Sequence, residues 1–263
     1  GEGDAWGQSW GTGWFRIRGR VPRDFAGRQV DLRFDPQGEC IVFRDGRPRQ
    51  GLDPNRKSYT LFEQARGGER FELYIEAGCN NAFGKYERRR VHGPELCVFL
   101  PEVWQAWHDL DALAQMLPLN WPDWWGKTHD LLPEQNTRRQ QLLHQLAKAV
   151  DLWDYQDASR DGLLASARRL RKALKPLYAC HAHDSAQTVA CMGHAHIDVA
   201  WLWPLRETIR KCGRTFSNVL SLMDRYPEFV FCQSQPHLYE FTRDRYPSLY
   251  REIKRRVKQG QWI

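Results

Sequence analysis

The chain has 263 residues, 41% of them hydrophobic and 27% charged, which is enough for one large or two ordinary domains with buried cores. The formal net charge is +7 at pH 7, but the arginines are spread thinly and no basic, aromatic-rich module is visible, so no nucleic-acid partner is expected. No run of 18 apolar residues and no signal-peptide pattern is present, so no membrane partner is expected, although a chain that does not begin with Met leaves a removed leader open.

The cysteines predict the cellular compartment. Their number is odd, no CxxC motif occurs, and several lie inside apolar runs, which is typical of reduced, buried thiols in a cytoplasmic protein. The seven are Cys40, Cys79, Cys97, Cys180, Cys191, Cys212 and Cys232.

Residues 1–100 predict a β-rich domain. Apolar residues alternate with arginine over 15–21, which indicates a half-buried strand with its charges in solvent, and the same period recurs over 30–34 and 71–75. The pair Asp45-Gly46 is a hairpin-turn signal. Short strands separated by turn residues favour a β-sandwich or jelly-roll-like domain.

Residues 101–185 predict a helical linker region. Apolar residues recur at three- and four-residue steps over 142–150 and again over 163–177, so we expect one helical face in each stretch. Tryptophans concentrate at the start of this region, with a connection over 121–128, and we expect most of them to be buried where helices and loops pack. They are Trp104, Trp107, Trp121, Trp124 and Trp125.

Residues 186–263 predict the start of an α/β domain. The run Thr188–Met192 is continuous and apolar, as in a buried strand of a parallel sheet. A helical pattern over 205–223, a second apolar strand over 229–232 and a helical pattern over 250–257 follow. This βαβα order is typical of a parallel sheet or barrel, in which ligands bind beyond the carboxyl ends of the strands.

The step His196-Ile197-Asp198 lies at that end of the first predicted strand. If the strand runs that far, His194, His196 and Asp198 share one face, and an imidazole with a carboxylate suits Zn²⁺ or a similar divalent ion. Trp201 adds a flat apolar surface, so the pattern favours a polyol or sugar site. Asp198 could equally cap the helix that follows, and the residues alone leave both interpretations open.

The segments GHAHIDVAWLWPLRETIRKC, PEFVFCQSQPHLYEF and RYPSLYREIKRRVKQGQWI closely resemble the start of the catalytic domain of the family 38 α-mannosidases, in their cytosolic and bacterial branch. GTGWFRIRGRVP, VDLRFDPQGECIVFRDGRPRQGLD and YIEAGCNNAFG look like the β-rich domain that precedes it in that branch. The resemblance implies three parts: a jelly-roll-like domain over 1–100, the helical linker over 101–185, and the start of a (β/α)7-barrel-like catalytic domain over 186–263.

The resemblance also implies a site. His196 and Asp198 match the family's ligands of the divalent ion, with Zn²⁺ expected and Co²⁺ as the alternative, and Trp201 matches the tryptophan that packs against the mannose ring. His194 matches no ligand, and we expect it to hydrogen-bond in a structural role. The implied activity is metal-dependent, retaining hydrolysis of terminal α-D-mannose from oligosaccharides, with mannose-containing oligosaccharides as partners and a homo-oligomer left open.

The resemblance places the two catalytic carboxylates beyond Ile263, so neither can be named. A retaining glycosidase needs a nucleophile and an acid/base about 5 Å apart. Four acidic residues of the last segment match no catalytic motif and are expected on the surface, and the 263 residues alone are expected to be inactive. The four are Asp224, Glu228, Glu240 and Asp244.

Two other classes of function compete with this interpretation. Trp6, Trp10 and Trp14 could form the ring-stacking face of a non-catalytic carbohydrate-binding module, although their spacing of four does not keep them on one strand face and favours core packing. A different metal-dependent hydrolase or deacetylase on a related barrel could also use a His-x-Asp step. The continuation Trp201-Leu202-Trp203-Pro204 favours the mannosidase.

Overall fold

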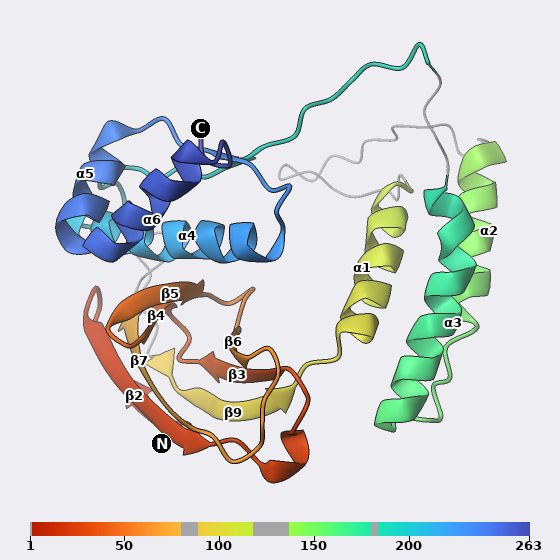
Figure 1. The fold of residues 1–263 in the computed structure, drawn as a ribbon, viewed down its shortest axis with the longest axis horizontal. Coiled ribbons are helices and arrows are strands. Elements are labelled where there is room, and N and C mark those ends of the chain that lie inside the picture. The colour runs from red at the N-terminus through yellow and green to blue at the C-terminus, as the bar shows by residue number, and fades with distance from the viewer. Residues whose placement is uncertain (1, 80–88, 118–136, 180–183) are drawn as a thin grey trace. The chain divides into compact units, whose positions relative to one another are not determined.

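The computed structural model of the chain describes residues 2–79, 89–117, 137–179 and 184–263 (Figure 1). It divides into two compact units, one formed by Gly1–Phe99 with Val189–Ile263 and the other by Leu100–Thr188. The predicted connection over 121–128, the residues Trp121, Trp124 and Trp125, and Cys180 lie outside the described residues.

The first hundred residues form a β-sandwich, as the alternating patterns predict. A four-stranded antiparallel sheet has the order β2-β7-β4-β5, and a three-stranded sheet has the order β6-β3-β9 (Figure 1). The strands are β2 (Thr12–Arg20), β3 (Val30–Asp35), β4 (Glu39–Arg44), β5 (Arg47–Leu52), β6 (Ser58–Phe62), β7 (Arg70–Gly78) and β9 (His92–Val98). A short pair, β1 (Ala5–Trp6) with β8 (Arg89–Arg90), and a 3-10 turn, η1 (Arg23–Phe25), complete this part.

The sandwich core follows from period-2 alternation. In the antiparallel ladder of β2 and β7, Ile17 lies opposite Leu73, and both are buried, whereas the neighbouring Arg16 and Arg18 are exposed. The hairpin signal at Asp45-Gly46 is confirmed, because both residues have positive φ, 53° and 70°, in the turn that joins β4 to β5.

Strand β4 is buried on both faces. Cys40 and Val42 point into the sandwich core, while Ile41 between them belongs to a second core with Phe216 and Leu220 of helix α4 (Leu205–Arg225). The backbone of β5 is also covered, since the Gly51 N–H donates to the Asn218 side-chain oxygen at 2.9 Å. The four-stranded sheet therefore carries α4 on its outer face (Figure 1).

The second core belongs to a βαβ unit. Strand β10 (Gly193–His194) pairs in parallel with β11 (Phe231–Cys232), and α4 connects them. The predicted order of strand, helix and strand is confirmed, but the first strand lies after the predicted one. Helices α5 (Pro236–Arg245) and α6 (Pro247–Lys258) follow, the first of which the sequence analysis missed. Together with α4, they bury Leu238, Leu249 and Ile253.

The prediction of a buried strand over Thr188–Met192 is wrong. These residues are exposed and have no regular structure, with Val189 at 77% and Met192 at 54% exposure. A buried parallel strand needs neighbours on both sides and helices over both faces. In the described part of the chain, β11 is the one strand that pairs with β10, so the apolar run has no sheet to enter.

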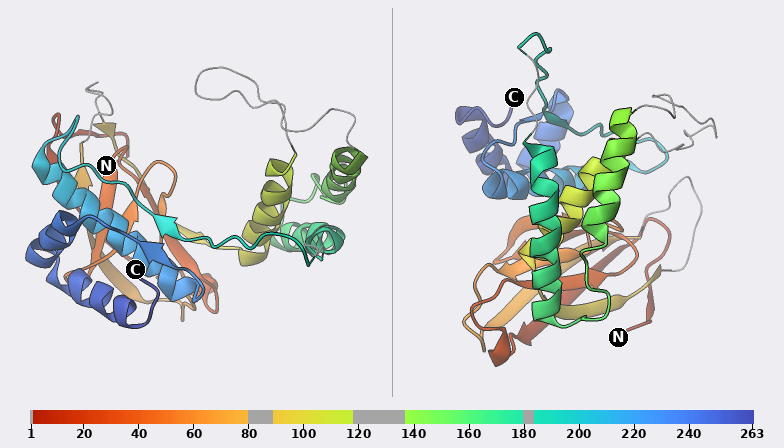
Figure 2. Two further views of the ribbon diagram at one scale, coloured as in Figure 1. Left: turned by 90° about the horizontal axis from the view of Figure 1, so that it is seen from above. Right: turned by 90° about the vertical axis from the view of Figure 1, so that its right-hand side faces the viewer.

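The second unit contains α1 (Pro101–Gln115), α2 (Thr137–Val150) and α3 (Arg160–Tyr178), which lie side by side (Figure 2). Leu113, Leu146, Leu170 and Leu174 pack in its core, so the predicted helical region is confirmed. The prediction of buried tryptophans is wrong for Trp104 and Trp107, which are exposed. Their positions flank the apolar stripe of α1, which consists of Val103, Ala106, Leu110 and Leu113.

The six cysteines in the described residues are free thiols. Cys40, Cys79 and Cys212 are buried, and burial raises the pKa of the Cys212 thiol to about 12 and raises that of Cys40 as well, so both stay protonated and inert at neutral pH. Cys191 is exposed, contrary to the expectation of burial, because it lies in the unpaired run before β10. In the residues described, no helix is long and apolar enough to cross a membrane.

Candidate metal and sugar site

The predicted site lies in the loop between β10 and α4. The step from His196 to Asp198 begins two residues after β10 ends at His194, and Ile197 is buried in the second core while the side chains on either side of it are not. The Gln233 side-chain amide donates to the Ala195 carbonyl at 2.5 Å and fixes the start of the loop against the end of β11. The His-x-Asp step therefore leaves the carboxyl end of a parallel strand, where α/β folds bind ligands.

His196 and Asp198 lie side by side. The distance from His196 Nε2 to Asp198 Oδ1 is 3.0 Å, and the two side chains are 74% and 38% exposed. Two ligands of one tetrahedral Zn²⁺, with bonds of about 2.0–2.2 Å, are about 3.3–3.6 Å apart, so the two side-chain atoms need to separate by only about 0.3–0.6 Å to hold the ion. The pair thus fits as two members of a ligand set. Within the described residues, no third His, Cys, Asp or Glu joins them.

The capping alternative for Asp198 and both expectations for His194, convergence with the metal ligands and a structural hydrogen bond, are wrong. Asp198 does not cap the following helix, since α4 begins at Leu205 and its cap residue Pro204 offers no side-chain hydrogen bond. His194 does not converge with His196 and Asp198. Strand β10 ends at His194, so the alternation that would place the three side chains on one face of a strand does not continue to His196 and Asp198. The His194 side chain is exposed and makes no hydrogen bond within the part of the chain that is described.

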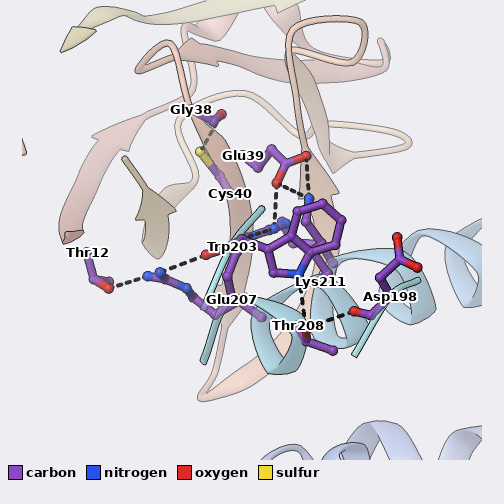
Figure 3. A network of polar contacts seen from close by, with 11 residues as sticks. Thr12, Gly38, Glu39, Cys40, Asp198, Trp203, Glu207, Thr208 and Lys211 are labelled. Carbon is purple, nitrogen blue, oxygen red and sulfur yellow. Dashed lines mark hydrogen bonds and ion pairs between the residues drawn. The ribbon is translucent and has the colours of Figure 1, made fainter. Parts of the chain in front are cut away.

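Trp201 presents its ring to solvent three residues after Asp198. It is 60% exposed, and its ring meets that of Trp203 edge to face, with centroids 5.4 Å apart. Trp203 is held in turn, since its indole Nε1–H donates to Thr208 Oγ1 at 3.0 Å and Lys211 Nζ lies 4.8 Å from its ring centroid (Figure 3). The ring of Trp201 is therefore exposed to solvent and packs against Trp203, whose own side chain is held in place.

Thr208, a buried residue in the first turn of α4, was not predicted from the sequence. Its hydroxyl accepts from the Ala200 N–H at 2.9 Å. It donates to the Asp198 carbonyl at 2.9 Å (Figure 3). Ala200 has a φ of 57°, a left-handed conformation that costs a non-glycine residue about 1–2 kcal/mol. A polar β-branched residue on the buried face of a helix start is the sequence signal that could have found it.

A buried charge network, also missed, joins α4 to the four-stranded sheet. Glu207 is fully buried and pairs with Arg210, at 2.7 Å between Oε2 and Nη2, and with Arg214. Arg214 and Lys211 both contact Glu39 of β4, at 2.6 and 2.9 Å (Figure 3). Burial lowers the pKa of the Arg214 guanidinium, but Glu39 and Glu207 outweigh burial and raise it. The Arg214 guanidinium therefore stays charged, and the ion pairs of this network hold α4 against the four-stranded sheet.

Polar side chains from the sandwich and from the βαβ unit also line a cavity of about 220 Å³ beside the loop that joins β10 to α4. It brings together His196 and Trp203 from the loop, Lys211 from α4, and Glu39 and Asp53 from the sandwich. The sandwich thus forms one wall next to the predicted metal ligand His196.

The tryptophans proposed for a carbohydrate-binding face do not share one. Trp6 packs edge-on against Phe15 of the sandwich core and donates its Nε1–H to the Pro36 carbonyl at 2.7 Å. Trp14 is 58% exposed and contacts Phe43, with centroids 5.4 Å apart. A single stacking platform of Trp6, Trp10 and Trp14 is therefore absent, as their spacing indicates.

The acidic residues of the last segment lie on the surface, as expected. Asp244 pairs with Arg243 at 2.8 Å, Asp224 pairs with Arg256, and Glu228 and Glu240 are exposed.

The comparisons with known proteins agree with this architecture. Residues 1–109 match the family model "Alpha-mannosidase, jelly roll domain", and residues 186–263 match "Glycosyl hydrolases family 38 N-terminal domain". The chain is 34% identical to Alpha-mannosidase 2C1 of Homo sapiens, over 99% of this chain and 25% of that protein. It is 30% identical to Alpha-mannosidase G of Dictyostelium discoideum, over 99% of this chain and 24% of that protein. It is 29% identical to Alpha-mannosidase of Saccharomyces cerevisiae, over 98% of this chain and 24% of that protein.

The chain thus spans about a quarter of the length of the curated relatives that it matches. Both matched segments and the relatives point to one family, and the structure has a β-sandwich within the first matched segment and a βαβ unit within the second. The chain belongs to glycosyl hydrolase family 38, as its N-terminal jelly roll and the beginning of its glycosidase domain.

Proposed function

We propose that these residues belong to a longer α-mannosidase that removes terminal α-D-mannose from oligosaccharides by metal-dependent, retaining hydrolysis. The observation that carries the proposal is the His196–Asp198 pair, 3.0 Å apart after the end of a parallel strand, in the same loop as the exposed ring of Trp201. The six described free thiols support a cytoplasmic location.

In this proposal, His196 and Asp198 supply two of the ligands of a divalent ion, Zn²⁺ or Co²⁺. The bound ion would polarise sugar oxygens as a Lewis acid and help to orient the ring. The loop residues position the metal ligand and the sugar. A hydrogen bond from Thr208 holds the Asp198 backbone against α4, and Trp201 offers an apolar face to the C–H groups of a mannose ring. The nucleophile and the acid/base would come from residues outside these 263.

Removing the metal should abolish activity. Dialysis of the longer protein against a chelator should eliminate release of the aryl group from an aryl α-mannoside, and Zn²⁺ or Co²⁺ should restore it. Proton NMR of the first product should show α-mannose, because retention preserves the anomeric configuration. Full activity without metal would reject the proposal, and so would metal-dependent release of acetate from an acetylated sugar with no cleavage of the aryl α-mannoside.

Replacing Trp201 by Ala should raise KM for an aryl α-mannoside about 10-fold with a smaller effect on kcat, because stacking of an exposed ring contributes on the order of 1–2 kcal/mol to binding. Trp201→Phe should recover part of the loss. Trp14→Ala is the matched control, since Trp14 is 58% exposed against 60% for Trp201 but lies on β2. Equal KM changes in both variants would assign Trp201 no role in sugar binding.

A further inference from the structure

We infer that the Thr208 hydroxyl is the positioning group of the predicted site: it fixes the loop from Asp198 to Trp203, and with it both the metal ligand and the sugar platform. The inference rests on the proposed function, because it concerns the residues that the proposal assigns to metal and sugar. Three hydrogen bonds of 2.9–3.0 Å carry it, and each ends on a different residue of this loop. Figure 3 shows the two that join Thr208 to Asp198 and to Trp203.

The hydroxyl is used to its full capacity. A threonine hydroxyl has one proton to donate and two lone pairs to accept with. It donates to the Asp198 carbonyl and accepts from the Ala200 N–H and the Trp203 Nε1–H. Thr208 is fully buried, so water has poor access to replace these partners when the hydroxyl is removed.

Each bond fixes a different part of the site. The bond to the Asp198 carbonyl holds the backbone from which the Asp198 carboxylate reaches His196. The bond from the Ala200 N–H holds the residue with positive φ at which the chain reverses towards Trp201. The bond from Trp203 holds the indole against which the Trp201 ring packs edge to face. The Thr208 side chain therefore positions both the Asp198 carboxylate and the Trp201 ring.

Helix α4, which carries Thr208, also contacts the jelly-roll domain. Thr208 lies on the same helix as Lys211, whose ammonium group contacts Glu39 of β4 at 2.9 Å and lies over the Trp203 ring. The indole of Trp203 is thus held from two sides, by Thr208 at its Nε1–H and by Lys211 at its face (Figure 3). The jelly-roll domain contributes to the geometry of the site through this contact.

The test compares Thr208→Val, which keeps the shape and removes the hydroxyl, with Thr208→Ser, which keeps the hydroxyl. Zn²⁺ affinity of the metal-free longer protein, measured by competition with a chromogenic chelator, should weaken 10- to 100-fold in Thr208→Val, the range seen when residues that orient ligands are replaced. The Zn²⁺ affinity of Thr208→Ser should stay within about 3-fold of that of the unsubstituted protein. KM for an aryl α-mannoside should rise in parallel in Thr208→Val, because Trp201 moves with the loop.

Thr242→Val is the matched control. Thr242 is also buried in this unit, on α5, but its hydroxyl donates to the Leu238 carbonyl of its own helix at 2.7 Å and does not reach the loop. The Thr242→Val variant should lose thermal stability as Thr208→Val does, but its Zn²⁺ affinity should be unchanged. Equal loss of affinity in the two valine variants, or unchanged affinity in Thr208→Val, would overturn the inference.

Asp198→Asn separates this inference from the proposed function. If Asp198→Asn loses Zn²⁺ while Thr208→Val keeps it, the metal site stands and the positioning role fails. If Asp198→Asn itself binds Zn²⁺ like the original protein, the proposed site fails and the positioning role fails with it.

Discussion

Asp198→Asn and His196→Ala are each expected to lower kcat/KM of the longer protein on an aryl α-mannoside by about 10³-fold or more. The two side chains lie 3.0 Å apart and are proposed to hold one ion, so losing either ligand loses the ion. A metal ion contributes several kcal/mol to transition-state stabilisation, and about 4 kcal/mol corresponds to 10³-fold. The metal content of the purified variants, measured by mass spectrometry, should fall with the activity.

The double variant provides a stronger test than either single one. Because the two residues act through the same ion, the double variant should lose little more than the single variants, and the sum of the single effects should far exceed the measured one. Asp244→Asn is the control, since Asp244 is an exposed carboxylate paired with Arg243 on the surface of α5. Full metal content and activity in Asp198→Asn would contradict the assignment.

Glu207→Gln is expected to destabilise the protein by about 3–5 kcal/mol. Glu207 is fully buried and carries the negative charge that faces Arg210 and Arg214, both of which are also buried. Neutralising Glu207 leaves the buried Arg210 without the carboxylate that it pairs with, and leaves Arg214 with Glu39 alone, in a medium of low dielectric. The shift in the midpoint of chemical denaturation, at constant slope, measures the loss.

An exposed pair gives the reference for this prediction. Glu252 contacts Arg255 one turn later on α6, and both side chains are nearly half exposed. Glu252→Gln should change the unfolding free energy by less than about 1 kcal/mol, because solvent screens the pair. If both glutamine variants shift the midpoint equally, the buried network has no special role in holding α4 to the sheet.

Local patterns anticipated much of the fold. Alternation of apolar and polar residues predicted β2, β3 and β7, and three- and four-residue steps predicted α3, α4 and α6. The same method missed β5, whose sequence RPRQGL has no alternation, and α5, whose apolar positions are few. It also placed a strand at Thr188–Met192, because an apolar run looks the same whether or not a sheet is there to receive it.

The sequence by itself determined the family, the order of the parts and the residues proposed for metal and sugar: His196, Asp198 and Trp201 lie in one short segment, and their chemistry can be read from their types and spacing. The tertiary structure alone decided what supports them. Ile41 faces α4 from the middle of a strand whose neighbours face the sandwich core, and Lys211 meets Glu39 across 172 positions of sequence. Contacts at that separation depend on how whole elements pack, and packing leaves no periodic signal in the local sequence.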